Sequence, residues 1–310
     1  MVYDRNLLDK YGQPALIRFD WAMKRLLRDK ASYVVLEGFL TCLLGRQIKI
    51  VSILESEGNQ ESGDDKFNRV DILAEDDLGE KLLIEVQNES QYSYFHRMLY
   101  GVSKLITEYI KKGEPYENVA KVISINIVYF SLGQGSDYVY VGTTNFYGLH
   151  NHDRLQIPEN WKNKLEIKEV QDIFPEYYIL RVNEFDEVSK TPLDQWISFL
   201  KTGMIPAEAD APGLPEAREK MRVDALSPNE RNAYYEHLQS DVDTRDILET
   251  AHLEGREEGL QEGREVGLQE GREEERRTTI LNMAKAGCDA ATIAKLTSYP
   301  LDEIEHILSD

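Results

Sequence analysis

Asp71, Glu85 and Gln87 are the residues whose types and spacing are best suited to chemistry. They lie in two short apolar segments, 69–73 and 83–87, which a turn can bring together. Carboxylate oxygens are hard ligands that suit Mg²⁺ or Mn²⁺. Such an ion can polarise a phosphodiester and activate the attacking water. The pattern therefore points to metal-dependent hydrolysis of a phosphodiester.

The turn between the two segments decides whether the two acids meet. If 77–79 is a three-residue hairpin loop, its glycine supplies the positive φ that this loop type favours. Asp76 then pairs with Glu80, and counting back places Asp71 directly opposite Glu85. Cross-strand neighbours have Cβ atoms roughly 4.5–5.5 Å apart, where like charges repel each other. A divalent cation would relieve that repulsion. The alternative, equally compatible with the pattern alone, is a pair of solvent-facing acids on an exposed hairpin.

The motifs around these residues resemble the PD-(D/E)XK nuclease superfamily, in which an acidic residue precedes a hairpin partner reading Glu-x-Lys or Glu-x-Gln. The chain is most similar to the Rpn branch, the recombination-promoting nucleases that are also described as transposases. Glu-x-Gln alone is a weak motif, but the resemblance covers most of the chain as an ordered set. The segments that carry it are Asp20-Trp-Ala-Met-Lys24, Asp71, Glu85-Val-Gln87, His96-Arg97-Met-Leu-Tyr100, Lys112-Gly-Glu-Pro-Tyr116, Leu193-Asp-Gln-Trp196 and the Glu-Gly-Arg tail.

The resemblance implies a restriction-endonuclease-like core, DNA as the partner and Mg²⁺ or Mn²⁺ as the cofactor. It assigns metal binding to Asp71, Glu85 and the backbone carbonyl of Val86. Gln87 occupies the place of the superfamily's usual lysine. A neutral amide cannot supply positive charge or exchange a proton at neutral pH, so we expect it to orient the attacking water. Because the Rpn branch is similar in carrying Gln here, the substitution does not indicate inactivity.

Five further residues are candidates for the site, each with a structural alternative. Glu37 lies on a predicted helix where relatives place an additional metal-binding acid, although a lone Glu on an amphipathic helix more often faces solvent. Arg97 and Tyr100 lie one helical turn apart and could hold a scissile phosphate or support the carboxylates. Alternatively, Arg97 pairs with a surface acid and Tyr100 packs beneath the sheet. Lys24 and Arg25 could contact the DNA backbone, although basic residues on a helix usually form a solvated face.

The string His150-Asn-His-Asp153 spells the letters of another nuclease motif, HNH. In that family the three residues are spread across a ββα unit. We therefore interpret this compact string as a polar loop.

The elements that must position the candidate site form an α/β pattern. Strand alternation places Gln87 on the face of Glu85 and turns the apolar residues between them to the other face. Helices before and after the hairpin indicate a mixed central sheet flanked by helices, with a helical C-terminal extension. Periodicity predicts helices over 19–27, 33–44, 92–112 and 192–201, and strands over 48–54, 66–75, 81–87, 119–130, 138–146, 165–170 and 177–182. The expected divisions are a nuclease-like domain (1–205), a linker and helical segment (206–250), a repeat helix (251–278) and a small helical module (279–310).

The repeat helix carries a glycine at every fourth position from 255 to 271. Each glycine costs a helix roughly 1 kcal/mol relative to alanine, so the segment needs either close helix–helix contact or tolerance of fraying. We expect self-association, as a dimer or a higher homo-oligomer, and the alternative is a dynamic charged helix. The last thirty residues predict short helices broken at Gly287 and before Pro300, too acidic for DNA recognition.

Composition limits the possible functions and raises one objection. The formal net charge of -20 argues against tight DNA binding, although the first fifty residues are basic. The two cysteines favour a reducing cytosol, and we expect a soluble cytoplasmic protein with no membrane partner because no apolar run is long enough to span a bilayer.

Three functions remain. The first is a metal-dependent DNA endonuclease linked to recombination or mobile elements. The others are a non-catalytic assembly or regulatory protein on a degenerate nuclease scaffold, and an RNA nuclease.

Overall fold

The structure, a computed structural model, describes residues 15–25, 30–54, 72–110, 113–165, 167–186 and 188–309. The chain divides into two compact units, the first ending at His237 and the second beginning at Leu238. No helix in the described ranges is both long enough and apolar enough to cross a membrane.

The first unit is built on a mixed sheet that has six strands within the described residues. Strands β3, β4 and β6 run parallel, and the remaining neighbours pair antiparallel. In sheet order the strands are β1 (Ile50–Leu54), β2 (Ile72–Asp76), β3 (Lys81–Gln87), β4 (Val122–Val128), β6 (Glu176–Arg181) and β5 (Val139–Gly142). The predicted mixed α/β fold is confirmed.

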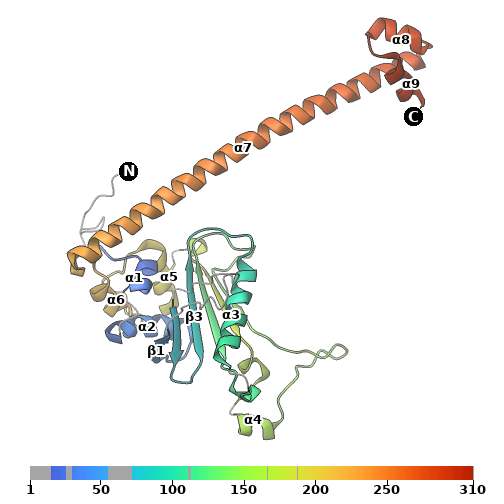
Figure 1. Ribbon diagram of the computed structural model, residues 1–310. Coiled ribbons are helices and arrows are strands. Elements are labelled where there is room, and N and C mark those ends of the chain that lie inside the picture. The colour runs from blue at the N-terminus through green and yellow to red at the C-terminus, as the bar shows by residue number, and fades with distance from the viewer. Residues whose placement is uncertain are drawn as a thin grey trace. The chain divides into compact units, whose positions relative to one another are not determined.

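Helices cover both faces of this sheet (Figure 1). On one face lie α1 (Phe19–Arg25), α2 (Tyr33–Leu44), α5 (Pro192–Thr202) and α6 (Leu214–Lys220), and on the other lies α3 (Tyr94–Tyr109). The remaining short elements of this unit are α4 (Glu159–Leu165) and the 3-10 helices η1 (Lys30–Ser32), η2 (Tyr116–Asn118), η3 (Val170–Asp172), η4 (Val182–Glu184) and η5 (Val223–Ala225). Because both faces are covered, every residue of the apolar strand β4 is buried, as its composition predicts.

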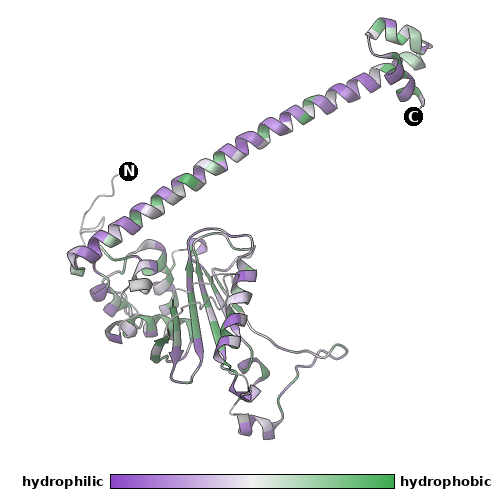
Figure 2. Ribbon diagram, in the orientation of Figure 1, coloured by the Kyte–Doolittle hydropathy of each residue, from purple (hydrophilic) through white to green (hydrophobic). Residues whose placement is uncertain are grey.

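The core has a different character on each face, and the strands at its centre are the most apolar part of the unit (Figure 2). On the α2 side, Phe19, Phe39, Trp196 and Phe199 form edge-to-face pairs with centroids 5.6–6.3 Å apart. On the α3 side, Tyr94 packs edge-to-face on Phe130, and a second cluster is mainly aliphatic. The buried members of that second cluster are Leu73, Leu83, Val102, Leu105 and Val122. The α3 helix is thereby fixed over β3 and β4.

Two segments differ from the sequence expectations. Residues 165–170 are expected to form a strand, but Leu165 ends α4, residues 167–169 form no strand and Val170 begins η3, where Glu169 and Asp172 form a capping box. The carboxylate of Asp172 accepts hydrogen bonds from the backbone N–H groups of Lys168 and Glu169, at 3.0 and 2.9 Å. Local side-chain hydrogen bonds of this kind compete with strand pairing.

The segment after residue 205, expected to be a linker, is packed within the first unit. Trp196 donates its indole N–H to the carbonyl of Pro212 at 2.9 Å. Leu214, Ala217 and Met221 are fully buried. The backbone N–H of Ile17 also donates to the carbonyl of Met221 at 2.6 Å. Alanine and proline in this stretch therefore permit close packing against α2 and α5.

The long helix α7 (Pro228–Lys285) contributes residues to both units. In the second unit its end packs with α8 (Ala290–Thr297) and α9 (Leu301–Ser309) around Ile280, Ile293 and Ile304. The breaks fall where the sequence predicts them, at Gly287 with its φ of 93° and before Pro300.

Candidate active site

The β2–β3 hairpin has the register that the sequence predicts. Gly79 adopts a φ of 77°, and the backbone N–H of Asp76 donates to the carbonyl of Glu80 at 3.2 Å. Ile72 then pairs with Ile84, at the far end of the described part of β2. Asp71 lies outside the described residues, so its position opposite Glu85 stays a prediction.

Glu85 is a buried acid on the face of the sheet that α3 covers. The residue is only 6% exposed, and its Oε1 lies 3.8 Å from the Nη2 atom of Arg97 on α3. That separation is long for an ion pair. A carboxylate at this depth is costly unless a cation or several donors compensate its charge.

Arg97 brings Gln87 into the same group. Its Nη1 atom donates to Oε1 of Gln87 and to Oε1 of Gln91, each at 3.5 Å. Its Nε atom is buried and has no hydrogen-bond partner among the described residues. The structure therefore brings Glu85, Gln87 and Arg97 together, with a guanidinium that is only loosely satisfied.

The other sequence candidates are distributed differently. Tyr100, one turn beyond Arg97, is 39% exposed on the outer side of α3. Lys24 and Arg25 lie in the last turn of α1, and the orientation of their side chains is outside what the structure describes. Val86 follows Glu85 in β3 and is half-buried.

Glu37 does not join the site. Its Oε1 accepts a hydrogen bond from the backbone N–H of Ile50 at 2.8 Å, and Ile50 pairs with Asp76 beside the hairpin turn. Glu85 lies five residues beyond Glu80, the partner of Asp76. At ~3.3 Å per strand residue, the two acids are separated by about 16 Å along the strands. Glu37 therefore anchors the start of β1.

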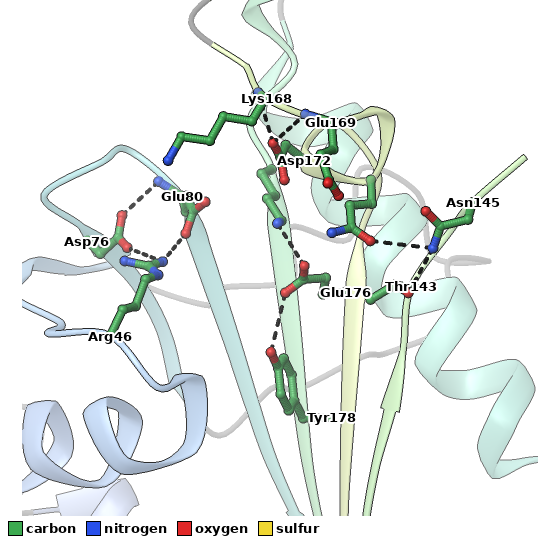
Figure 3. A network of polar contacts seen from close by, with 12 residues as sticks. Arg46, Asp76, Glu80, Thr143, Asn145, Lys168, Glu169, Asp172, Glu176 and Tyr178 are labelled. Atoms are coloured by element: carbon green, nitrogen blue, oxygen red, sulfur yellow. Dashed lines mark hydrogen bonds and ion pairs between the residues drawn. The ribbon is translucent and has the colours of Figure 1, made fainter. Parts of the chain in front are cut away.

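The turn end of the hairpin carries its own polar network (Figure 3). Arg46 pairs with Glu80 and, at 3.0 Å, with the buried Asp76. Nearby, Lys121 pairs with Glu176 at 2.9 Å. Burial raises the pKa of Glu80, and the charge of Arg46 only partly opposes that rise. This network secures the hairpin at the end remote from Glu85.

His150-Asn-His-Asp153 forms a polar loop, as interpreted from the sequence. Its ends are joined by a bridge between Tyr147 and Arg154, and His152 has a φ of 59°. Among the residues that the structure describes, no group of three or more His, Cys, Asp or Glu side chains is placed to hold a metal ion, and Asp71 is not among those residues.

Sequence reasoning assigned no role to Asp20, a buried acid at the carboxyl end of β3. Asp20 accepts hydrogen bonds from Arg18 at 3.0 Å and from Asn88 at 3.5 Å, and its Oδ2 lies 3.2 Å from Nε2 of His237. Burial alone raises the pKa of Asp20, but the hydrogen bond with His237 and the charges of Arg18 and His237 outweigh burial and lower it to about 2. The only sequence signal was its place in the Asp20-to-Lys24 motif.

The carboxyl ends of β3 and β4 therefore hold one buried acid on each face of the sheet, Glu85 beneath α3 and Asp20 on the side of α1. A family model described as PD-(D/E)XK nuclease family transposase matches residues 17–251. The chain belongs to this family. No curated protein and no solved structure matches the chain. Membership confirms the resemblance drawn from the motifs and supports a nuclease- or transposase-like function.

The residues present fit the divalent metals that PD-(D/E)XK nucleases generally use. Glu85 offers a carboxylate and Val86 a backbone carbonyl. These are hard oxygen donors, and such donors suit Mg²⁺ or Mn²⁺ better than softer metals. A cation at this position would place positive charge beside the buried carboxylate of Glu85.

Proposed function

We propose that this PD-(D/E)XK family member is a metal-dependent endonuclease that hydrolyses phosphodiester bonds in DNA, in the service of recombination or mobile elements. The observation that supports this proposal best is the convergence of Glu85, Gln87 and Arg97 from two elements. A purely structural role does not explain why a buried acid and an amide lie beside a guanidinium whose Nε atom has no hydrogen-bond partner among the described residues.

In this proposal Asp71, Glu85 and the carbonyl of Val86 hold Mg²⁺ or Mn²⁺. The hairpin register continued by one residue is what would set Asp71 opposite Glu85. When bound, the ion supplies Lewis-acid stabilisation of the phosphodiester and of the attacking water.

The remaining side chains position the attacking water and the DNA. The amide of Gln87 orients the attacking water, since it both donates and accepts hydrogen bonds but exchanges no proton at neutral pH. Arg97 binds the scissile phosphate, because guanidinium groups match phosphate oxygens in geometry and charge. Tyr100 adjoins Arg97 on the same helix, and Lys24 and Arg25 contact the DNA backbone nearby.

The experiment is a cleavage assay on labelled duplex DNA, single strands and RNA with Mg²⁺, Mn²⁺ or chelator. We expect duplex nicking that needs metal and falls to background in Glu85→Gln and Asp71→Asn. For Arg97→Gln we expect a loss on the order of 10²–10³, as for removal of other transition-state donors. Glu117→Gln, an exposed acid on η2, is the matched control and should cleave normally.

The outcomes separate the alternatives. Cleavage that survives chelator or Glu85→Gln would refute the proposed site. Cleavage of RNA alone would assign the site to an RNA nuclease. Absence of cleavage on every substrate, with the fold intact, would favour a non-catalytic assembly or regulatory protein, which the net charge of -20 and the absent lysine at position 87 also suggest.

We also infer that α7 mediates self-association into a homodimer or a higher homo-oligomer. Residues 249–275 of this helix are exposed, and an added Cβ at any of the five repeat glycines meets nothing within 4 Å in the described part of the chain. A helix with five glycines gains stability from a second helix in close contact. Light scattering of a chain truncated after Thr250 tests the inference, and an unchanged assembly state would contradict it.

A further inference from the structure

The loop before α3 and the outer face of that helix form a surface unlike the rest of this acidic chain. Acidic residues make up 56 of the 310 positions, yet none occurs from Ser90 to Thr107. The same stretch carries His96, Arg97 and Lys104. This stretch therefore carries positive charge of its own, although the net charge of the chain is strongly negative.

Large apolar side chains stand exposed on this surface. Tyr92 is fully exposed, Phe95 is 51% exposed and Leu99 is 59% exposed. Tyr100 is also exposed. We call these four residues, three aromatic and one aliphatic, the α3 aromatic surface. Apolar rings left in water are costly, and a cluster of them indicates a binding surface.

The α3 aromatic surface continues from the proposed active site. Arg97 lies on the flank of α3 next to Glu85 and Gln87, at the carboxyl end of β3. Phe95 lies on the opposite flank, where its ring approaches Gly133 in the loop after β4. Strands β3 and β4 are parallel, so both flanks of α3 lie near the carboxyl-terminal ends of these strands. An extended ligand that passed from Arg97 to Phe95 would cross the first turn of α3, a helix about 10 Å wide.

Exposed rings and a guanidinium on a stretch of chain that contains no acids match one ligand chemistry well. Bases of an unpaired strand stack on aromatic side chains, while phosphates need basic groups and repel carboxylates. Bases within a duplex are already stacked on each other and offer no free faces. We propose that the α3 aromatic surface binds an unpaired nucleic-acid strand that continues from the scissile phosphate, with bases stacked on Tyr92 and Phe95. This inference rests on the proposed nuclease function.

The test is binding of fluorescently labelled single strands and of duplex of the same sequence, by anisotropy in chelator so that no cleavage occurs. Tyr92→Ala and Phe95→Ala should each weaken single-strand binding by roughly 5- to 150-fold, the range for loss of one stacked base. Duplex binding should change less than about twofold, because backbone contacts persist. Phe95→Tyr, which keeps the ring, should bind normally. So should Tyr116→Ala, the control, which removes a ring 90% exposed outside this surface.

The inference would be overturned if single-strand binding were unchanged in both variants, if duplex binding fell equally, or if the natural protein bound no nucleic acid. It would also be overturned if either variant differed from the natural protein in assembly mass, since the surface would then be a protein–protein contact. Because Tyr92 precedes the helix and is fully exposed, its variant remains informative if Phe95→Ala unfolds. Failure of the nuclease proposal is read separately. In that case metal-dependent cleavage is absent, while single-strand binding that depends on Tyr92 and Phe95 remains measurable.

Discussion

Replacing Asp20 by asparagine tests whether a buried charge holds the carboxyl end of β3. The carboxylate of Asp20 joins Arg18, Asn88 and His237, which come from three distant parts of the chain. Asparagine keeps the size of the side chain but removes the charge. It therefore tests the electrostatic contribution with little change in packing.

The size of the effect follows from the pKa of Asp20. That pKa is lowered from 3.8 to about 2, and one pKa unit corresponds to 1.36 kcal/mol, so the charge stabilises the folded unit by about 2 kcal/mol at neutral pH. Because the folded pKa is the lower one, this stability is present above pH 4 and is lost as the pH falls from about 4 towards 2. For a unit of this size the loss corresponds to about 4–8 °C in Tm.

The assay is urea and thermal unfolding of the full chain, followed by tryptophan fluorescence, since Trp21 and Trp196 are both buried in the first unit. We expect Asp20→Asn to lose about 2 kcal/mol at pH 7 and to approach the natural protein as the pH falls below 4. Asp77→Asn, at the exposed hairpin turn, is the control. A loss under about 0.5 kcal/mol at pH 7, or a difference that does not shrink in acid, would refute the reasoning.

Two further changes have expected outcomes. Gly38→Ala should destabilise the first unit by about 1–3 kcal/mol or more, measured by urea unfolding, because its Cβ would lie 2.5 Å from the backbone of Gly213. A neutral result would contradict the close contact between α2 and the segment before α6. Replacing the five repeat glycines of α7 by alanine should raise intrinsic helix stability by roughly 1 kcal/mol per site. If the glycines allow close helix contact, sedimentation should nevertheless show weaker assembly, whereas unchanged assembly with higher helicity would indicate a helix that needs no partner.

The hairpin could be predicted from the sequence because its determinants are local. Gly79 sets the turn, and the alternation of polar and apolar residues sets the register, so the pairing of Asp76 with Glu80 followed from counting. The helix that carries Arg97 was equally predictable from its periodicity. Its position over Glu85 was not, because periodicity shows which face of a helix is apolar but not which strand the helix covers.

The contacts that sequence reasoning missed join distant residues or depend on tertiary position. Asp20 and His237 are 217 positions apart, and no pattern in either segment indicates that they meet. Glu37 illustrates the converse. Its helix was predicted with the correct bounds, yet that helix lies over the start of β1, where its carboxylate binds Ile50. Predicting a helix therefore did not locate its functional groups.

The net charge of -20 is a weaker objection to a nucleic-acid substrate than it first appears, because electrostatic steering depends on where charges lie. At roughly 8 Å screening length in physiological salt, a phosphate near Arg97 responds to its immediate surroundings. The stretch from Ser90 to Thr107 contains no acids, and the buried carboxylate beside Arg97, that of Glu85, is the group that a bound cation would neutralise. Metal binding would therefore make the local potential more positive and free Arg97 from its distant contact with Glu85, so affinity for a phosphate should rise with metal occupancy.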